Sequence, residues 1–199
     1  MGWDYPSAVR GVLAALCALA STGTASASSP SAAPPGAGAP EVAPAPEIAH
    51  TQPPADESER LLVLHNAERA RLGLPPLVWN SALARDAGAY AKVILSRGEL
   101  QHASESERKG NGENLWMGTS GTWDADAMVG MFLEERRFFR AAAFPDVSLT
   151  GNWADVGHYS QIVWRDTKQV GCAVDSGRGM DVLVCRYYPA GNVFGKNPY

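Results

Sequence analysis

The chain has 199 residues, a formal net charge of −4, and 45% hydrophobic and 19% charged residues. This length fits one medium domain with additional segments, because single domains cluster around ~100–150 residues. The charge excludes a typical nucleic-acid-binding protein, which needs a concentrated basic face. No stretch approaches the ~20 apolar residues that a transmembrane helix requires. The composition therefore indicates a globular protein that does not bind nucleic acid and has no transmembrane helix.

The N-terminus has the pattern of an export signal. Arg10 precedes an apolar run at residues 11–20, and the small residues Ala25, Ser26 and Ala27 follow. A charged start, a short apolar core and an A-x-A site are typical of a signal peptide. We therefore predict a signal peptide over residues 1–27 and a secreted protein, extracellular or periplasmic if the producer is bacterial.

Residues 28–55 are rich in proline and alanine and contain almost no large apolar side chains. Such a segment cannot offset the entropy of folding and is expected to be a disordered linker. The globular domain is then predicted over residues 56–199. A first helix should begin at Asp56, with Glu59 completing a capping box. On this helix Leu61 and His65 should face the core, and the charged residues are expected in solvent: Arg60, Glu68, Arg69 and Arg71.

A second helix is predicted from Ser81 to Arg97, because Asn80 is a good N-cap and Gly98 a helix terminator. A polar, glycine-rich loop follows around Glu113. A third helix should start near Thr122 or Asp124, with a buried stripe formed by Met128, Met131, Phe132, Phe138 and Phe139. Glu134 lies one turn from Met131 and from Phe138, so it should point to the edge of the core and need a partner there.

Two alternating runs around Cys172 and Cys185 predict a β-hairpin closed by the turn at residues 175–179. Folding about this turn sets Cys172 opposite Cys185 and Val170 opposite Tyr187. An exported chain with this pair of cysteines is expected to form a disulfide, and two free buried thiols are the alternative. Helices followed by a late hairpin with two apolar faces predict an α+β fold, with helical layers on both sides of a small antiparallel sheet.

Four motifs, in this order along the chain, resemble the CAP superfamily of cysteine-rich secretory proteins, antigen 5 and plant pathogenesis-related proteins of class 1. Residues 157–164 read GHYSQIVW and residues 185–192 read CRYYPAGN. His65-Asn66 with Arg69, and His102 with the GENL run at residues 112–115, fit the same order. The resemblance implies an α-β-α sandwich with a surface cleft.

The resemblance also implies a cleft tetrad of two histidines and two glutamates, at His102, Glu113, Glu134 and His158. Glu135 is the alternative for the third-helix position, where Met131-Phe132 stands in place of the usual Trp-Tyr pair. The two histidines could bind a divalent ion such as zinc, with the acids as ligands or as orienting groups. The alternative is a hydrogen-bonded cluster that only holds the cleft together.

The predicted function is a secreted binding module without enzymatic activity. Some family members bind sterols or other lipids, and Phe144 and Trp153, in the long loop at residues 141–156, are the predicted lining of such a site. The alternative function is a metal-dependent hydrolase in which Glu113 or Glu134 acts as general base. The ending, Pro189 to Tyr199, resembles a segment that plant members release as a peptide, although the same residues would also cap the fold.

Overall fold

The computed structural model describes residues 57–199. The predicted signal peptide, the linker and the Asp56 cap lie outside the described residues. The elements in chain order are α1 (Glu57–Arg71), β1 (Val78–Trp79), α2 (Ser81–Arg97), α3 (Glu105–Arg108), β2 (Gly112–Thr119), α4 (Ala125–Glu134), the 3-10 turns η1 (Glu135–Phe138) and η2 (Trp153–Val156), α5 (Gly157–Ile162), β3 (Gln169–Gly177) and β4 (Met180–Tyr188).

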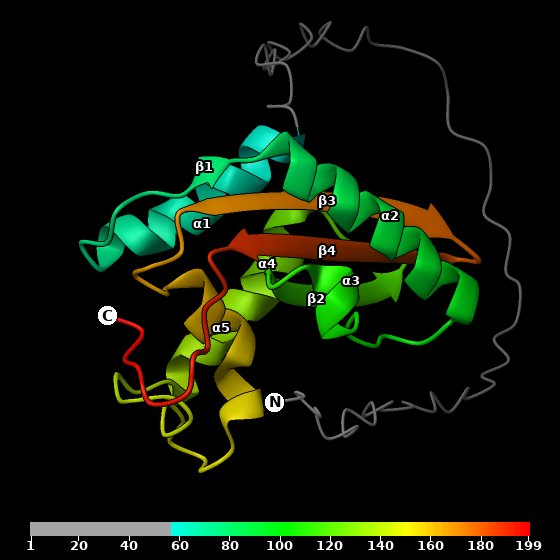
Figure 1. The fold of residues 1–199 in the computed structure, drawn as a ribbon. Coiled ribbons are helices and arrows are strands. Elements are labelled where there is room, and N and C mark those ends of the chain that lie inside the picture. Colours follow the sequence, from blue (N-terminus) through cyan, green and yellow to red (C-terminus); the bar gives the residue numbers. More distant parts are fainter. Residues whose placement is uncertain (1–56) are drawn as a thin grey trace, which may run out of the picture. The chain divides into compact units, whose positions relative to one another are not determined.

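One four-stranded sheet lies between two helical layers (Figure 1). The strand order is β1-β3-β4-β2, so β2 is an edge strand. The strands β2, β3 and β4 are antiparallel, whereas the short β1 pairs with β3 in parallel. The helix α2 covers one face through Ala87, Tyr90 and Ile94, and α1 and α4 cover the other. This α-β-α sandwich confirms the predicted fold class.

The hairpin β3–β4 has the register that the sequence predicted. Cys172 lies opposite Cys185, and Val170 lies opposite Tyr187. The two cysteines form a disulfide across the strands. The prediction for α2 is also confirmed, because the Asn80 side chain accepts hydrogen bonds from the first turn and Gly98 ends the helix in a left-handed conformation.

The charged face predicted for α1 is only partly in solvent. Glu68 and Arg69 are buried, with 5% and 0% of their surface exposed, so the expectation that they face solvent is wrong. Arg69 donates to the carbonyl oxygens of Pro75, Ile162, Trp164 and Thr167 at 2.8–3.3 Å. Its planar guanidinium thereby satisfies carbonyls in the turn after α5, which ties α1 to the segment that carries the GHYSQIVW motif.

The helix α4 begins after Asp124, as predicted, but it ends at Glu134 and continues as the 3-10 turn η1. Met128 and Phe132 are buried, whereas Met131 and Phe138 are 40% and 39% exposed. The predicted stripe is therefore wrong at Met131 and Phe138. A 3-10 turn has three residues per turn rather than 3.6, so Phe138, the last residue of η1, leaves the face that a continuous α-helix would give it.

Candidate functional site

The first half of the candidate site is the pair of His158 and Glu135. Glu135 leads η1 and His158 lies in the first turn of α5. The Nδ1 atom of His158 lies 2.5 Å from Glu135 Oε1. The other carboxylate oxygen, Oε2, accepts from the backbone N–H groups of His158 and Tyr159 at 3.0 and 2.9 Å. The Phe132 ring stacks on the imidazole, with 4.7 Å between ring centroids.

Glu134, the predicted third-helix member of the tetrad, does not take part in this pair. Its side chain is 69% exposed, and its nearest charged partner is Arg137 at 3.9 Å. The prediction that Glu134 points to the edge of the core is therefore wrong. The structure places the alternative residue, Glu135, against His158, at helical spacing from the buried residues Met128 and Phe132 of α4.

The second half is the pair of His102 and Glu113. His102 lies in the loop after α2, and Glu113 is the second residue of β2. His102 Nδ1 lies 2.7 Å from Glu113 Oε1, which also accepts from the backbone N–H of Ala103 at 3.0 Å. The carboxylate of Glu113 is fully buried, whereas 24% of the His102 side chain is exposed.

The two pairs share one hydrogen-bonding pattern. In each, a glutamate bonds the Nδ1 atom of a histidine and the backbone N–H of the residue that follows this histidine. A carboxylate can only accept, so each Nδ1 carries a proton, and a ring with a single proton has its lone pair on Nε2. Carboxylates behind imidazoles are typical of histidines that bind metals through the other nitrogen.

The four side chains form two pairs and not one closed cluster. Glu113 and Asn114 are consecutive on β2 and point to opposite faces of the sheet. Glu113 lies on the α2 face, opposite Arg186. Asn114 lies on the other face and donates to the carbonyl oxygen of His158 at 3.0 Å. Strand β2 therefore holds the His102 ring through Glu113 on one face and the His158 backbone through Asn114 on the other.

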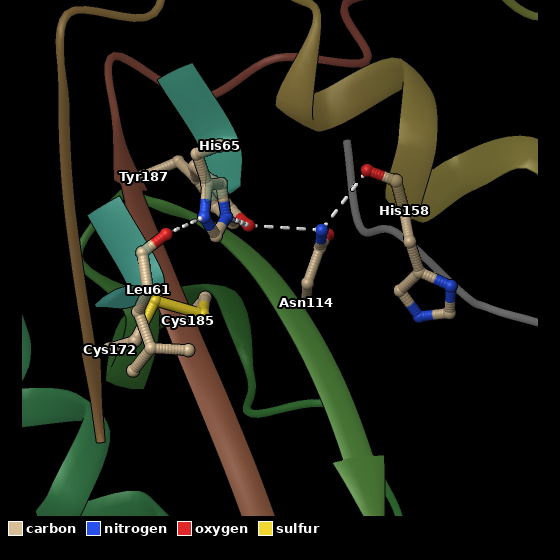
Figure 2. Close-up of a disulfide and its surroundings, with 7 residues drawn as sticks. All are labelled: Leu61, His65, Asn114, His158, Cys172, Cys185 and Tyr187. Carbon is tan, nitrogen blue, oxygen red and sulfur yellow. Dashed lines mark hydrogen bonds between the residues drawn. A yellow bond between two sulfur atoms is a disulfide. The ribbon is translucent and has the colours of Figure 1, made fainter. Parts of the chain in front are cut away.

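A buried chain of hydrogen bonds runs from His65 in α1 through Tyr187 to Asn114 in β2 (Figure 2). His65 Nδ1 donates to the Leu61 carbonyl oxygen at 2.7 Å, so Nε2 accepts from the Tyr187 hydroxyl at 2.8 Å. The hydroxyl oxygen in turn accepts from the Asn114 amide at 3.1 Å. His65 faces the core, as predicted, and both of its ring nitrogens are used in hydrogen bonds there. The parts of Tyr187 and Asn114 in the chain were not anticipated, because only the strand pairing brings these residues together.

Protonation in this chain is fixed by burial. Burial lowers the pKa of His65 to about 4, although the hydrogen bond to Leu61 opposes the shift. Burial also raises the pKa of Tyr187, so its hydroxyl stays protonated and continues to donate. A neutral imidazole and a protonated phenol are the states that the observed donor and acceptor order requires.

Within residues 57–199, one group of three His, Cys, Asp or Glu side chains brings its ligand atoms within 4.8 Å of one another: His65, Cys172 and Cys185. Both sulfur atoms of this group are used by the disulfide, and both ring nitrogens of His65 are hydrogen-bonded. These three residues therefore form a structural cluster.

The predicted lipid-lining residues lie in a separate aromatic cluster. Phe144 is 1% exposed and contacts the rings of Trp153 and Phe194, with centroids 5.2 and 5.1 Å apart. Its ring therefore fills the core under the long loop, where it leaves little surface for a ligand. The tail packs over the same end of the fold: Gly191 and Asn192 donate to Gln161 and Gly157 in α5.

Helices on both faces of a small sheet, with two carboxylate-held histidines at its edge strand, define the α-β-α class of secretory domains that the sequence motifs resemble. No helix within residues 57–199 is both long and apolar enough to span a bilayer.

The chain belongs to the cysteine-rich secretory protein family, CAP, which it matches over residues 62–187. It is 32% identical to pathogenesis-related protein 1B of Nicotiana tabacum over 153 residues, which cover 76% of this chain and 86% of the tobacco protein. It is also 32% identical to pathogenesis-related protein PR-1 of Medicago truncatula, over 70% of this chain and 78% of that protein.

Solved structures show the same fold. The crystal structure of NaASP2 with Zn²⁺ superposes with a TM-score of 0.61 and 25% identity, covering 73% of this chain and 86% of that one. The structure of hookworm platelet inhibitor has a TM-score of 0.57 and 21% identity, with 71% and 73% covered.

Proposed function

We propose that this CAP domain is an exported binding module whose two histidines hold a divalent ion, with zinc as the first choice. The proposal depends mainly on one observation: Glu113 and Glu135 each accept a hydrogen bond from the Nδ1 atom of a histidine. His102 and His158 would be the protein ligands, both through Nε2. Neutral imidazoles with carboxylates behind them suit zinc, and bound zinc supplies a Lewis acid with positions open to further ligands.

The similarity to a structure determined with Zn²⁺ supports this choice of metal. Export is supported by the N-terminal signal pattern and by the disulfide, because disulfides persist mainly in oxidising compartments. Identification of the N-terminal residue of the secreted chain by mass spectrometry tests the export step. A mature chain that begins after Ala27 is the expected result.

Binding is favoured over hydrolysis by the state of the carboxylates. A general base needs an oxygen that can take a proton from water. The oxygens of Glu135 accept three hydrogen bonds from His158 and Tyr159, and Glu113 is buried against His102 and Arg186. Glu134, the other predicted base, lies in solvent beside Arg137. We therefore assign both paired glutamates to orienting the imidazoles.

Isothermal titration of the purified full chain with zinc tests the proposal. We expect one saturable site, lost in His158→Ala and in His102→Ala and unchanged in the surface control Glu134→Gln. Equal zinc binding by the wild type and both alanine variants would overturn the assignment. Hydrolysis of a broad set of peptides and esters, measured with zinc and with chelator, tests the alternative: a zinc-dependent activity lost in His158→Ala would replace binding by catalysis.

A further inference from the structure

Arg186 is a buried cation beside the pair formed by His102 and Glu113. It lies directly opposite Glu113 in the β2–β4 register, and its Nη2 atom is 3.0 Å from Glu113 Oε2, with only 3% of its side chain exposed. The guanidinium lies over the Tyr90 ring, 5.1 Å from the centroid. Its Nε and Nη1 atoms and Glu113 Oε2 are all buried with no hydrogen-bond partner among the described residues, so the contact between the two residues is an ion pair and not a hydrogen bond.

This environment is a poor one for a residue whose role is to stabilise the fold. A buried ion pair contributes little net stability, because removing both charges from water offsets their attraction. Two buried donors without partners add to the cost. The stacking on Tyr90 recovers part of this cost, since cations over aromatic rings are attracted. An arginine in this environment therefore calls for a role that depends on its contact with Glu113.

The two histidine–glutamate pairs differ in how the carboxylate is held. Glu135 is held by backbone N–H groups on one oxygen and by His158 on the other. Glu113 has the same two kinds of contact on Oε1 alone, and its Oε2 faces Arg186. Without Arg186, nothing holds Oε2, so the carboxylate could rotate out of line with Nδ1 of His102 and leave the ring free to turn.

We propose that Arg186 is a positioning residue that fixes the carboxylate of Glu113 and, through it, the ring orientation of His102. Arg186 occupies Oε2, which leaves Oε1 for the imidazole and for the Ala103 N–H. The Nδ1 proton of His102 then points at Glu113 and the lone pair stays on Nε2. The consequence for zinc rests on the proposed function, whereas the consequence for the imidazole does not.

The test is nitrogen-15 NMR of the histidine side chains in the metal-free full chain, which reports which ring nitrogen carries the proton. We expect a single tautomer for His102 in the wild type and a mixture of both tautomers in Arg186→Met. His158 is the internal reference and should be unchanged in both proteins. Arg186→Lys, which keeps the charge, should restore most of the wild-type tautomer at His102.

Arg108→Met is the matched control. Arg108 donates to the carbonyl oxygen of Ala103 at 3.0 Å, so it holds the same loop without touching Glu113. Its loss should leave the His102 tautomer unchanged. A single unaltered tautomer in folded Arg186→Met would overturn the proposal. The same mixture in Arg108→Met would overturn it too, because general loosening of the loop would then be the cause.

A measurement on the wild type covers the case in which Arg186→Met does not fold. A buried, ion-paired guanidinium should show side-chain protons that exchange slowly with solvent, and exchange as fast as for exposed arginines would overturn the proposal. Zinc titration separates this inference from the proposed function. With a working site, Arg186→Met should weaken zinc binding by about 10- to 100-fold, the usual cost of losing an outer partner. A wild type that binds no zinc would refute the metal site and leave the tautomer result standing.

Discussion

The Nε2 atom of His65 lies 2.8 Å from the hydroxyl oxygen of Tyr187, across 122 positions of sequence and inside the core. This hydroxyl is shared, because it donates to His65 and accepts from Asn114. Since Asn114 also holds the carbonyl oxygen of His158, one phenol connects α1 to the helix that carries a candidate ligand.

Removing this hydroxyl should destabilise the fold. In Tyr187→Phe, the buried Nε2 of His65 loses its donor and the Asn114 amide loses one acceptor, at a cost of about 1–3 kcal/mol for each unsatisfied group. We expect the free energy of unfolding in urea to fall by about 2–4 kcal/mol. The control is the next residue, because Tyr188 is 53% exposed. Tyr188→Phe should change stability by less than about 0.5 kcal/mol, and equal losses in the two variants would contradict the chain of hydrogen bonds.

The low pKa of His65 predicts a dependence of stability on pH. Burial lowers this pKa from 6.5 in the unfolded chain to about 4 in the folded protein, so acid favours the unfolded state. The contribution of His65 is complete above pH 6.5 and is lost as the pH falls from 6.5 to about 4. Between about pH 7 and pH 5, the wild type should lose about 2 kcal/mol more than His65→Gln. Urea unfolding at both values measures this difference, and parallel curves would contradict the buried neutral imidazole.

Two adjacent glutamates give a direct test of the corrected site. Glu135→Gln leaves an amide that can accept on one atom only, so the three donors of His158 and Tyr159 can no longer all be satisfied. We expect a loss of about 1–3 kcal/mol in unfolding free energy and a zinc affinity about 10- to 100-fold lower. Glu134→Gln should match the wild type in both measurements, since its side chain is exposed. Losses of stability and zinc affinity in Glu134→Gln, with none in Glu135→Gln, would instead place Glu134 in the site.

The disulfide should contribute to stability through the unfolded chain. It joins residues 13 positions apart, and closing a loop of this length stabilises by about 3 kcal/mol. The double variant Cys172→Ala/Cys185→Ala should lose about this amount in urea unfolding, with the hairpin pairing retained. The same loss on reduction of the wild type with a thiol would agree with this result, and unchanged stability after complete reduction would contradict it.

The parts of the fold that could be predicted are those that a local signal determines. Asn80 and Gly98 marked α2 by their capping chemistry, and the alternation around Cys172 and Cys185 set the hairpin register. The strand β2 carried no such signal, because the burial of its first five residues on both faces removes the alternation. Glu68 and Arg69 were wrongly assigned to the solvent-exposed face, because the sequence does not show which charged side chains have hydrogen-bond partners in the core.

In the candidate site, the sequence prediction failed at one residue, the glutamate that pairs with His158. The choice of Glu134 relied on its spacing from Met131 and Phe138, and both of these residues are exposed in the structure. The buried residues Met128 and Phe132 continue at the helical spacing of three and seven to Glu135, so the correct glutamate could have been chosen with these two as the guide. The sequence did not indicate the change to a 3-10 turn, which moves Phe138 out of the predicted stripe.

The position of Glu113 and Asn114 as neighbours on an edge strand has a consequence for how this domain can change. An insertion or deletion of a single residue in β2 just after Asn114 would turn both side chains to the wrong faces while the rest of the strand stays paired with β4, because strands alternate with a period of two. Both histidines would then lose an anchor in one event, even with every amino acid of the site still present. Variation in chain length is therefore tolerable in the flanking loops and excluded from this short stretch.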